Sequence, residues 1–175
     1  MSIITKGYDG KFGEAYGGDL PNGVHMNVVL AERGSATYAE AVRSLASPTK
    51  GHVPFLACLG ANNLVRPTTI VINKVTMEDE EYARLFSGAA QIGLSQGVLD
   101  AVKEGYIQQE DMEDIALLVA CWLDPDATEE TTIRLNARNA MFDAIVKAIQ
   151  PITPEYVEDQ LQYYETARNN FYKGN

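Results

Sequence analysis

Runs of apolar and β-branched residues predict the strands of this chain. Residues 24–31 (VHMNVVLA) are typical of a strand, and residues 68–76 (TTIVINKVT) give the strongest strand signal. Residues 53–60 form a shorter apolar run of strand length. Residues 112–123 fit a helix or a strand, and we predict a strand over 117–123.

A different spacing, with apolar residues three and four positions apart, predicts a first helix after the turn-like sequence at 32–35. Ser35 is a good N-cap residue for a helix that runs to about Ala46. Ala39, Val42 and Ala46 have the spacing of one helical face.

A longer helical stretch follows the 68–76 run. The four acids Glu78–Glu81 suit a first helical turn, because the helix dipole favours negative charge there. Thr76 is a candidate N-cap, with Asp79 completing a capping-box-like pair. Ser87-Gly88 predicts a break or kink, and Gly105 ends the stretch.

The last third of the chain is predicted to be mostly helical. Residues 126–150 form a helix closed by Pro151, whose inward positions are Ile133, Ala137, Ala140, Met141, Ala144, Ile145 and Ala148. Thr153-Pro154 has the signature of an N-cap followed by proline at the first helical position. It predicts a final helix that carries Tyr156, Leu161, Tyr164 and Phe171.

The order of these elements predicts an α+β two-layer sandwich with a C-terminal helical extension. We divide the chain into a domain over residues 1–150 and a helical tail over residues 151–175. No internal repeat or low-complexity tract interrupts it.

Composition narrows the classes of partner. The chain has 175 residues and a formal charge of -10, which argues against nucleic acid and anionic membrane surfaces as partners. Apolar runs such as 115–121 are too short to span a membrane, and the N-terminus lacks the apolar segment of a signal peptide. Cys58 and Cys121 are expected to be reduced packing residues of a cytoplasmic protein, with a buried disulfide as the alternative.

Candidate chemistry comes from polar residues inside apolar strands, since the usual nucleotide, hydrolase and metal motifs are missing. Alternate residues of a strand point to the same face. The side chains of His25 and Asn27 are therefore expected on one face of their strand, and those of Lys74 and Thr76 on one face of another. Two histidines and two separated cysteines do not suggest a zinc site, and we predict no metal. Two polar pairs on strands that face one cleft form a candidate site.

Each of these residues also has a purely structural interpretation. His25 can be a half-buried histidine with local hydrogen bonds, and Lys74 can extend from a sheet edge into solvent. Thr76 can serve only as a helix cap, and Gln91 can satisfy a helix kink. His52 follows Lys50-Gly51 in a turn and is expected to be a solvated loop residue.

Beyond these patterns, several ordered segments of the chain resemble the formaldehyde-activating enzyme family. The matching segments are Gly13-Glu14-Ala15, His25 at the start of a strand, Arg33-Gly34-Ser35, Asn63-Leu64-Val65-Arg66-Pro67, Asn73-Lys74-Val75-Thr76, Ala90-Gln91 with Gly93, and Asp100-Ala101-Val102 with Glu104-Gly105. The likeness covers roughly residues 13–150 and does not extend to the tail.

The resemblance implies a hydro-lyase of one-carbon metabolism, linked to methylotrophy and formaldehyde detoxification. Such an enzyme condenses formaldehyde with tetrahydromethanopterin as co-substrate, giving the methylene derivative and water. The resemblance also implies a fold similar to domain 2 of ribosomal protein S5. The expected assembly is a ring-shaped homopentamer with sites between subunits.

Carried over residue by residue, the family's proton-donating histidine corresponds to His25. The positions that contact the pterin and the other substrate correspond to Asn27, Leu56, Lys74, Thr76 and Gln91. Strand alternation had independently selected four of these residues.

Two positions depart from the family pattern. Asn27 stands where the family has an aspartate, and Ile92 stands where members tend to have a histidine. Asparagine keeps an acceptor oxygen but has no charge and takes up no proton. Two alternatives follow: a weak paralogue that binds a pterin or formaldehyde as a sensor or sequestering protein, and an enzyme with a folate-type acceptor.

Overall fold

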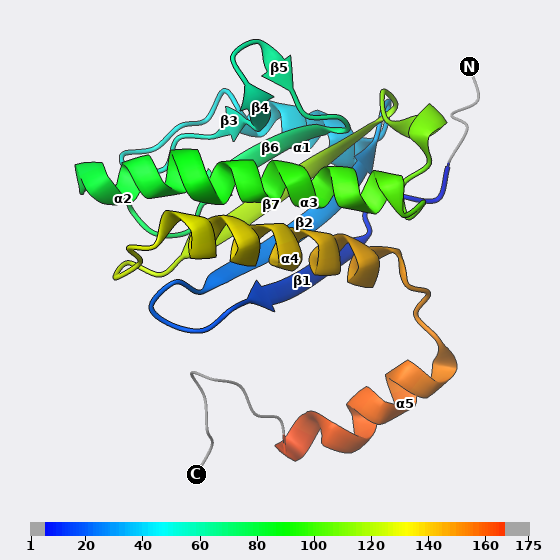
Figure 1. Ribbon diagram of the computed structural model, residues 1–175. Coiled ribbons are helices and arrows are strands. Elements are labelled where there is room, and N and C mark those ends of the chain that lie inside the picture. Colours follow the sequence, from blue (N-terminus) through cyan, green and yellow to red (C-terminus); the bar gives the residue numbers. More distant parts are fainter. Residues whose placement is uncertain (1–5, 167–175) are drawn as a thin grey trace.

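The computed structural model describes residues 6–166, and its centre is a five-stranded sheet (Figure 1). The sheet has the order β1-β2-β7-β6-β3, with β6 and β7 parallel and the other neighbours antiparallel. Its strands are β1 (Phe12–Gly17), β2 (Val24–Glu32), β3 (Phe55–Leu56), β6 (Thr68–Asn73) and β7 (Ile115–Leu123). A separate two-stranded ribbon consists of β4 (Cys58–Gly60) and β5 (Asn63–Leu64).

Helices cover one face of the sheet and leave much of the other face open. The helices are α1 (Ala36–Ser44), α2 (Glu80–Leu85), α3 (Gln91–Lys103), α4 (Glu130–Ile149) and α5 (Pro154–Tyr163). α3 and α4 lie side by side across the covered face, whereas α1 packs on part of the opposite face and α5 stands apart (Figure 1). This arrangement confirms the predicted α+β two-layer sandwich with a C-terminal helix.

The core lies between the sheet and the α3–α4 pair. Val24, Met26, Val28 and Leu30 of β2 are fully buried against the helices, as are most of the inward positions predicted for α4. Each such side chain contributes roughly 1.5–3 kcal/mol by leaving water. The helical periodicity therefore identified the face of α4 that holds the fold together.

Small residues explain why β1 was missed from the sequence. Its inward positions are Gly13, Ala15 and Gly17, so it lacks the large apolar alternation of a strand. A Cβ atom on Gly13 would lie 2.0 Å from the carbonyl oxygen of Ala144 in α4. The close approach of α4 requires glycine here, and glycine hides the strand pattern.

Three other expectations about local structure were wrong. The run at 53–60 is split between β3 and β4, which belong to different sheets. α1 faces the sheet with Tyr38, Ala41 and Leu45, whereas Ala39, Val42 and Ala46 are exposed. The N-cap of α2 is Asp79, whose side chain accepts from the Tyr82 N–H, and Thr76 does not cap it.

Other local predictions are confirmed. Ser35 caps α1 by accepting from the Tyr38 N–H, and Thr153 caps α5 in the same way, with Pro154 following it. A π-helical segment, Phe86–Ala90, interrupts the helix at the predicted Ser87-Gly88 break. Phe171, expected in the last helix, lies outside the described residues.

The two cysteines do not form a disulfide, so that alternative is wrong. Cys121 lies in the core, and burial raises the pKa of its thiol to about 12. The thiol is therefore neutral at ordinary pH and acts as a packing group, as predicted. None of the helices within residues 6–166 is both long and apolar enough to cross a membrane.

Candidate active site

Three of the six predicted site residues meet on the open face of the sheet. His25 and Asn27 project from β2, and Lys74 follows directly after β6. The Nζ atom of Lys74 lies 3.0 Å from Nδ1 of His25 and also donates to Oδ1 of Asn27. Two residues that are 49 positions apart in sequence thus place an imidazole and an ammonium group in contact.

Strand order and one small side chain allow this contact. β7 lies between β2 and β6, so Lys74 reaches across about 10 Å, twice the usual spacing of neighbouring strands. Its backbone N–H donates to the Cys121 carbonyl at 2.8 Å, which keeps its side chain on the open face although β6 ends at Asn73. Ala120 of β7 stands opposite Asn27 and leaves space above the strand.

Glu14 completes the cluster, and sequence reasoning did not select it as a site residue. It stands opposite Asn27 in the β1–β2 register. Its Oε2 atom accepts from Nδ2 of Asn27 at 2.9 Å and lies 3.4 Å from Nε2 of His25. A carboxylate opposite a polar residue of the neighbouring strand could have indicated that Glu14 belongs to the site, but only if β1 had been predicted as a strand.

The aromatic ring of Tyr16 shields His25 from the side of β1. The two rings are stacked with centroids 4.0 Å apart. Among the described residues, Nε2 of His25 is buried and makes no well-formed hydrogen bond, although the Glu14 carboxylate lies 3.4 Å from it. A buried imidazole nitrogen without a partner is costly, and it is poised to bond a group that enters the site.

Burial and charge favour the neutral form of the imidazole. Burial, and then the Lys74 cation, lower the pKa of His25 below its ordinary value of 6.5, and Glu14 opposes this shift. Burial also lowers the pKa of Lys74. At neutral pH the ring is therefore neutral, and its Nδ1 atom is in position to accept a hydrogen bond from the Lys74 side chain.

We expect the Lys74→Met variant to raise the pKa of His25. The substitution removes the neighbouring cation and keeps an unbranched apolar side chain, so the repulsion is lost while most of the burial remains. The measurement is an NMR titration of the His25 ring. Lys103→Met, at an exposed position, is the matched control and should leave the titration unchanged. An unshifted His25 titration in Lys74→Met would contradict the assigned contact.

The other three predicted site residues lie elsewhere. Thr76 is exposed and its hydroxyl pairs with Nε2 of His52 at 2.9 Å, so it does not share the Lys74 site. Leu56 of β3 lies on the same face of the sheet as His25 but away from it, packed beside Ala41 and Ile70 beneath α1. The strand alternation that was extended to Thr76 fails because β6 ends three residues earlier.

Gln91 belongs to the helical layer and is only 6% exposed. Its amide donates to the Cys58 carbonyl and to the Ser95 hydroxyl, the latter at 3.0 Å. His52, expected to be a solvated loop residue, is half-buried and also bonds the Asn73 carbonyl through Nδ1 at 2.8 Å. One chain therefore does not gather all the predicted positions around one point.

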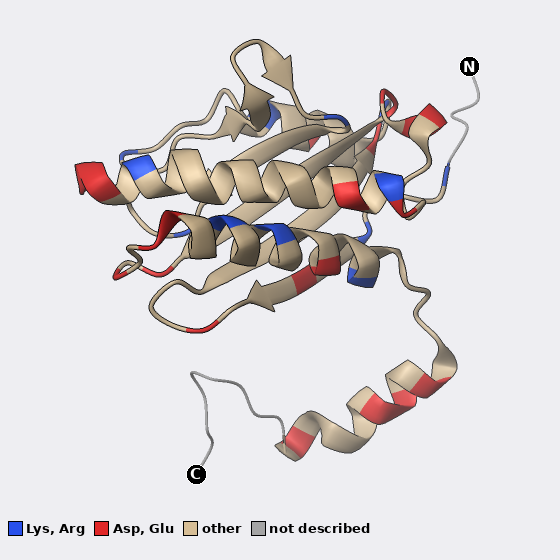
Figure 2. Cartoon of the chain, viewed as in Figure 1, with Lys and Arg blue, Asp and Glu red and all other residues tan. Residues whose placement is uncertain are grey.

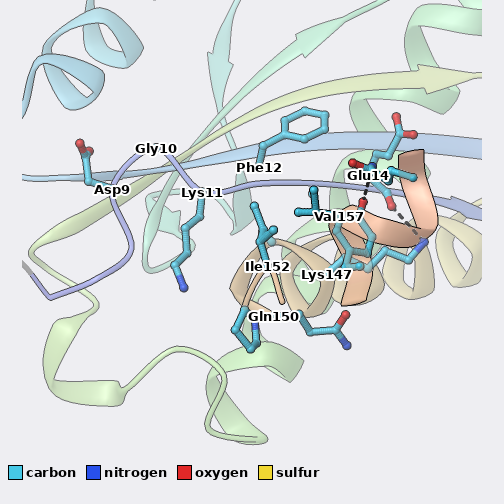
Figure 3. A pocket seen from close by; sticks show the side chains of 14 residues that line it. Asp9, Gly10, Lys11, Phe12, Glu14, Lys147, Gln150, Ile152 and Val157 are labelled. Carbon is cyan, nitrogen blue, oxygen red and sulfur yellow. Dashed lines mark hydrogen bonds between the residues drawn. The ribbon is translucent and has the colours of Figure 1, made fainter. Parts of the chain in front are cut away.

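A groove of about 1150 Å³ runs along the edge of β1, on the side of α5 (Figure 3). Lys11, Phe12 and Glu14 line one wall, and Ile152, Tyr156 and Val157 line the other. Glu14 thus touches both the groove and the His25 cluster. Within residues 6–166, no group of three or more His, Cys, Asp or Glu side chains is arranged to hold a metal ion.

Comparison with known proteins gives a consistent result over nearly the whole chain. The model of the family described as formaldehyde-activating enzyme (Fae) matches residues 12–171. The chain is 33% identical over 171 residues to the 5,6,7,8-tetrahydromethanopterin hydro-lyase of Methanosarcina barkeri, covering 98% of this chain and 95% of that protein. The likeness therefore extends past residue 150 into the tail, further than the sequence motifs indicated.

Bifunctional Fae/Hps enzymes match over a shorter span. The enzyme of Methanosphaerula palustris is 28% identical over 83% of this chain, and that of Methanothrix thermoacetophila is 30% identical over 79%. The matched part is 37% and 35% of their lengths, so this chain corresponds to only one portion of them. The extent of the family match and the full-length relative settle the assignment: the chain belongs to the formaldehyde-activating enzyme family.

Proposed function

We propose that this protein condenses formaldehyde with tetrahydromethanopterin to give the methylene derivative and water. The observation that carries the proposal is the contact between His25 and Lys74, because it joins two positions that the family resemblance selects. The relative from Methanosarcina barkeri, named a tetrahydromethanopterin hydro-lyase, supports the same reaction.

The reaction needs a proton at the step where water leaves. Formaldehyde and a secondary amine form a carbinolamine, and its hydroxyl departs as water once it is protonated. We assign that protonation to His25, a contribution typically worth about 10²–10⁴-fold in rate. Because the ring is neutral, its proton comes from the Lys74 ammonium through Nδ1.

The substrate contacts are proposed to come from two copies of the chain. His25, Asn27 and Lys74 meet at one point of the open face. Leu56 lies further along the same face, beneath α1, and Thr76 and Gln91 lie in other parts of the fold. A site between subunits of a homo-oligomer, as the resemblance to a pentameric family implies, would bring both groups to one pterin. The exposed rings of Phe12 and Tyr16, 55% and 51% accessible, are consistent with a face that another subunit covers.

The tail over residues 151–175 is proposed to support this assembly. α5 lines the groove beside β1, but none of its side chains is buried there. It carries acidic residues but no lysine or arginine (Figure 2). Deleting residues 151–175 should therefore leave the stability of the 1–150 domain nearly unchanged while lowering the oligomer mass in sedimentation.

A point variant separates assembly from the effects of truncation. Leu161→Asp places a charge at an apolar position of α5 that is 66% exposed, and we expect the same loss of mass. Asp159→Asn, on the same helix, is the control and should assemble as the wild type does. An unchanged mass in both the deletion and the Leu161→Asp variant would rule out the proposed role of the tail.

Asn27→Asp tests how the missing carboxylate affects the reaction. The substitution restores a negative charge next to His25 and Lys74, which raises the pKa of the ring. We expect the condensation to keep its high rate up to a higher pH than in the wild type, because the His25 ring then holds its proton up to a higher pH. The assay follows formaldehyde consumption that depends on tetrahydromethanopterin, over a pH series. Asn63→Asp, at an exposed position of β5, is the control and should not shift the profile.

The same assay separates the three functions. Pterin-dependent consumption by the wild type supports the enzyme proposed here. Activity that appears only in Asn27→Asp, with tight pterin binding by the wild type, supports a sensor or sequestering protein. Turnover with a tetrahydrofolate alone supports the folate-type acceptor.

A further inference from the structure

We infer that Lys74 is itself the nucleophile that captures formaldehyde, holding the carbon as an iminium on Nζ before it passes to the pterin. The inference rests on the function proposed above, because it assigns the first chemical step of that reaction to a side chain. It changes Lys74 from a source of positive charge into a covalent carrier of the one-carbon unit.

The surroundings of Nζ suit an amine that must lose its proton. Its two partners are a ring nitrogen of His25 and the amide oxygen of Asn27, both neutral. Among the described residues, no carboxylate lies within ion-pair distance of Nζ. Lys6 shows the contrast, since Asp111 and Asp114 hold its ammonium group in the charged form. The asparagine at position 27 thus removes a charge that would hold Lys74 protonated.

Burial works in the same direction. Lys74 is half-buried, and removal from water disfavours its ammonium form and lowers its pKa, as for other nucleophilic lysines. The titratable groups beside it on the open face are His25 from β2 and Glu14 from β1, and Glu14 opposes the shift. Cys121 of β7 lies on the core side of the sheet, where its thiol is neutral.

His25 lies where the proton must go. Nδ1 is 3.0 Å from Nζ and accepts the ammonium proton, and the resulting imidazolium is stabilised by Glu14, whose Oε2 atom is 3.4 Å from Nε2. The free amine then attacks the carbon of formaldehyde: the N–C bond forms, and the carbonyl π electrons move to oxygen, which takes up the proton that the nitrogen releases. The product is a carbinolamine on Lys74.

The second half of the step returns the proton from His25. The imidazolium protonates the hydroxyl of the carbinolamine, the C–O bond breaks, and the nitrogen lone pair forms the C=N bond. The sum is balanced, because an ammonium group and formaldehyde become an iminium and one water. A secondary amine of the pterin then attacks the methylene carbon and the C–N bond to Lys74 breaks, which leaves an iminium on the pterin and a free Lys74 amine. The second pterin nitrogen closes the ring, and its proton returns Lys74 to the ammonium form, with no oxidant or reductant required.

The test is reductive trapping of the full chain with ¹³C-formaldehyde and cyanoborohydride at neutral pH, without pterin. Cyanoborohydride reduces an iminium to a stable N-methyl group, and peptide mass mapping locates it. We expect Lys74 to be labelled several-fold faster than Lys50 and Lys103, which are exposed and serve as internal references. His25→Gln should slow the labelling of Lys74 and leave that of Lys103 unchanged.

Lys74→Arg tests whether turnover can proceed without the amine, since it keeps a cation but provides no nucleophile; the labelling above separates capture of formaldehyde from proton supply. We expect it to lose the enzyme-dependent condensation. Labelling of Lys74 no faster than that of Lys103, or wild-type condensation by Lys74→Arg, would overturn the inference and leave the proposed function standing. Preferential labelling without any pterin-dependent reaction of the wild type would instead support capture and refute the proposed function.

Discussion

Replacing His25 by alanine is expected to lower the enzyme-dependent rate of formaldehyde condensation by about 10²–10⁴-fold, the usual contribution of a positioned acid or base. His25 touches Lys74, Glu14 and Tyr16, and its Nε2 atom has no other partner among the described residues. Its loss therefore removes the only described imidazole in contact with Lys74. The measurement compares the rates of wild type and His25→Ala with the uncatalysed reaction subtracted.

Two further measurements would show that the loss of rate comes from proton transfer. The urea midpoint of the variant is measured beside the rate, and a rate loss without a matching loss of folded protein assigns the effect to chemistry. Imidazole added to the solution should restore part of the lost rate, because it can occupy the vacated space and donate a proton. A His25→Ala rate equal to that of the wild type would show that the proton comes from another group.

Gly93→Ala is expected to destabilise the protein by about 1–3 kcal/mol or more, the usual range for overpacking a close contact. α3 and α4 approach each other at this glycine, and a Cβ atom there would lie 2.1 Å from the carbonyl oxygen of Arg134. That atom belongs to the α4 backbone, so the contact is relieved only if a whole helix moves. Urea unfolding measures the loss.

Gly88→Ala is the matched control for this prediction. Gly88 lies five residues earlier in the same helical stretch, but a Cβ atom there would have nothing within 4 Å. The substitution should stabilise the protein by roughly 0.5–1 kcal/mol, since alanine loses less conformational entropy in a helix. If both variants changed the free energy of unfolding equally, the close approach of α3 and α4 would not be the cause.

Most of the architecture was predictable because its signals are local. Caps at Ser35 and Thr153, the break at Ser87-Gly88 and the buried stripe of α4 depend on residues within a few positions of one another. The face of α1 was not predictable in this way, because two sets of residues had suitable spacing. Contact with Ala31 and Ile70 of the sheet, which are distant in sequence, selects between them.

The candidate site was predictable in part for a similar reason. Alternation along β2 correctly placed His25 and Asn27 on one face, and it also placed Lys74. It failed for Thr76, since the strand ends before that residue, and it offered no reason to include Glu14. The roles of Leu56, Thr76 and Gln91 at a shared site stay predictions.

The amino-acid sequence alone determined the α+β class, the family resemblance and the residue types available for chemistry, because these depend on short-range patterns and motifs. Only the tertiary structure decided that β7 separates β2 from β6, and that Lys74 crosses it to reach His25. It also showed that Glu14 adds the carboxylate. Strand order and register arise from packing over the whole sheet, so no local pattern contains them.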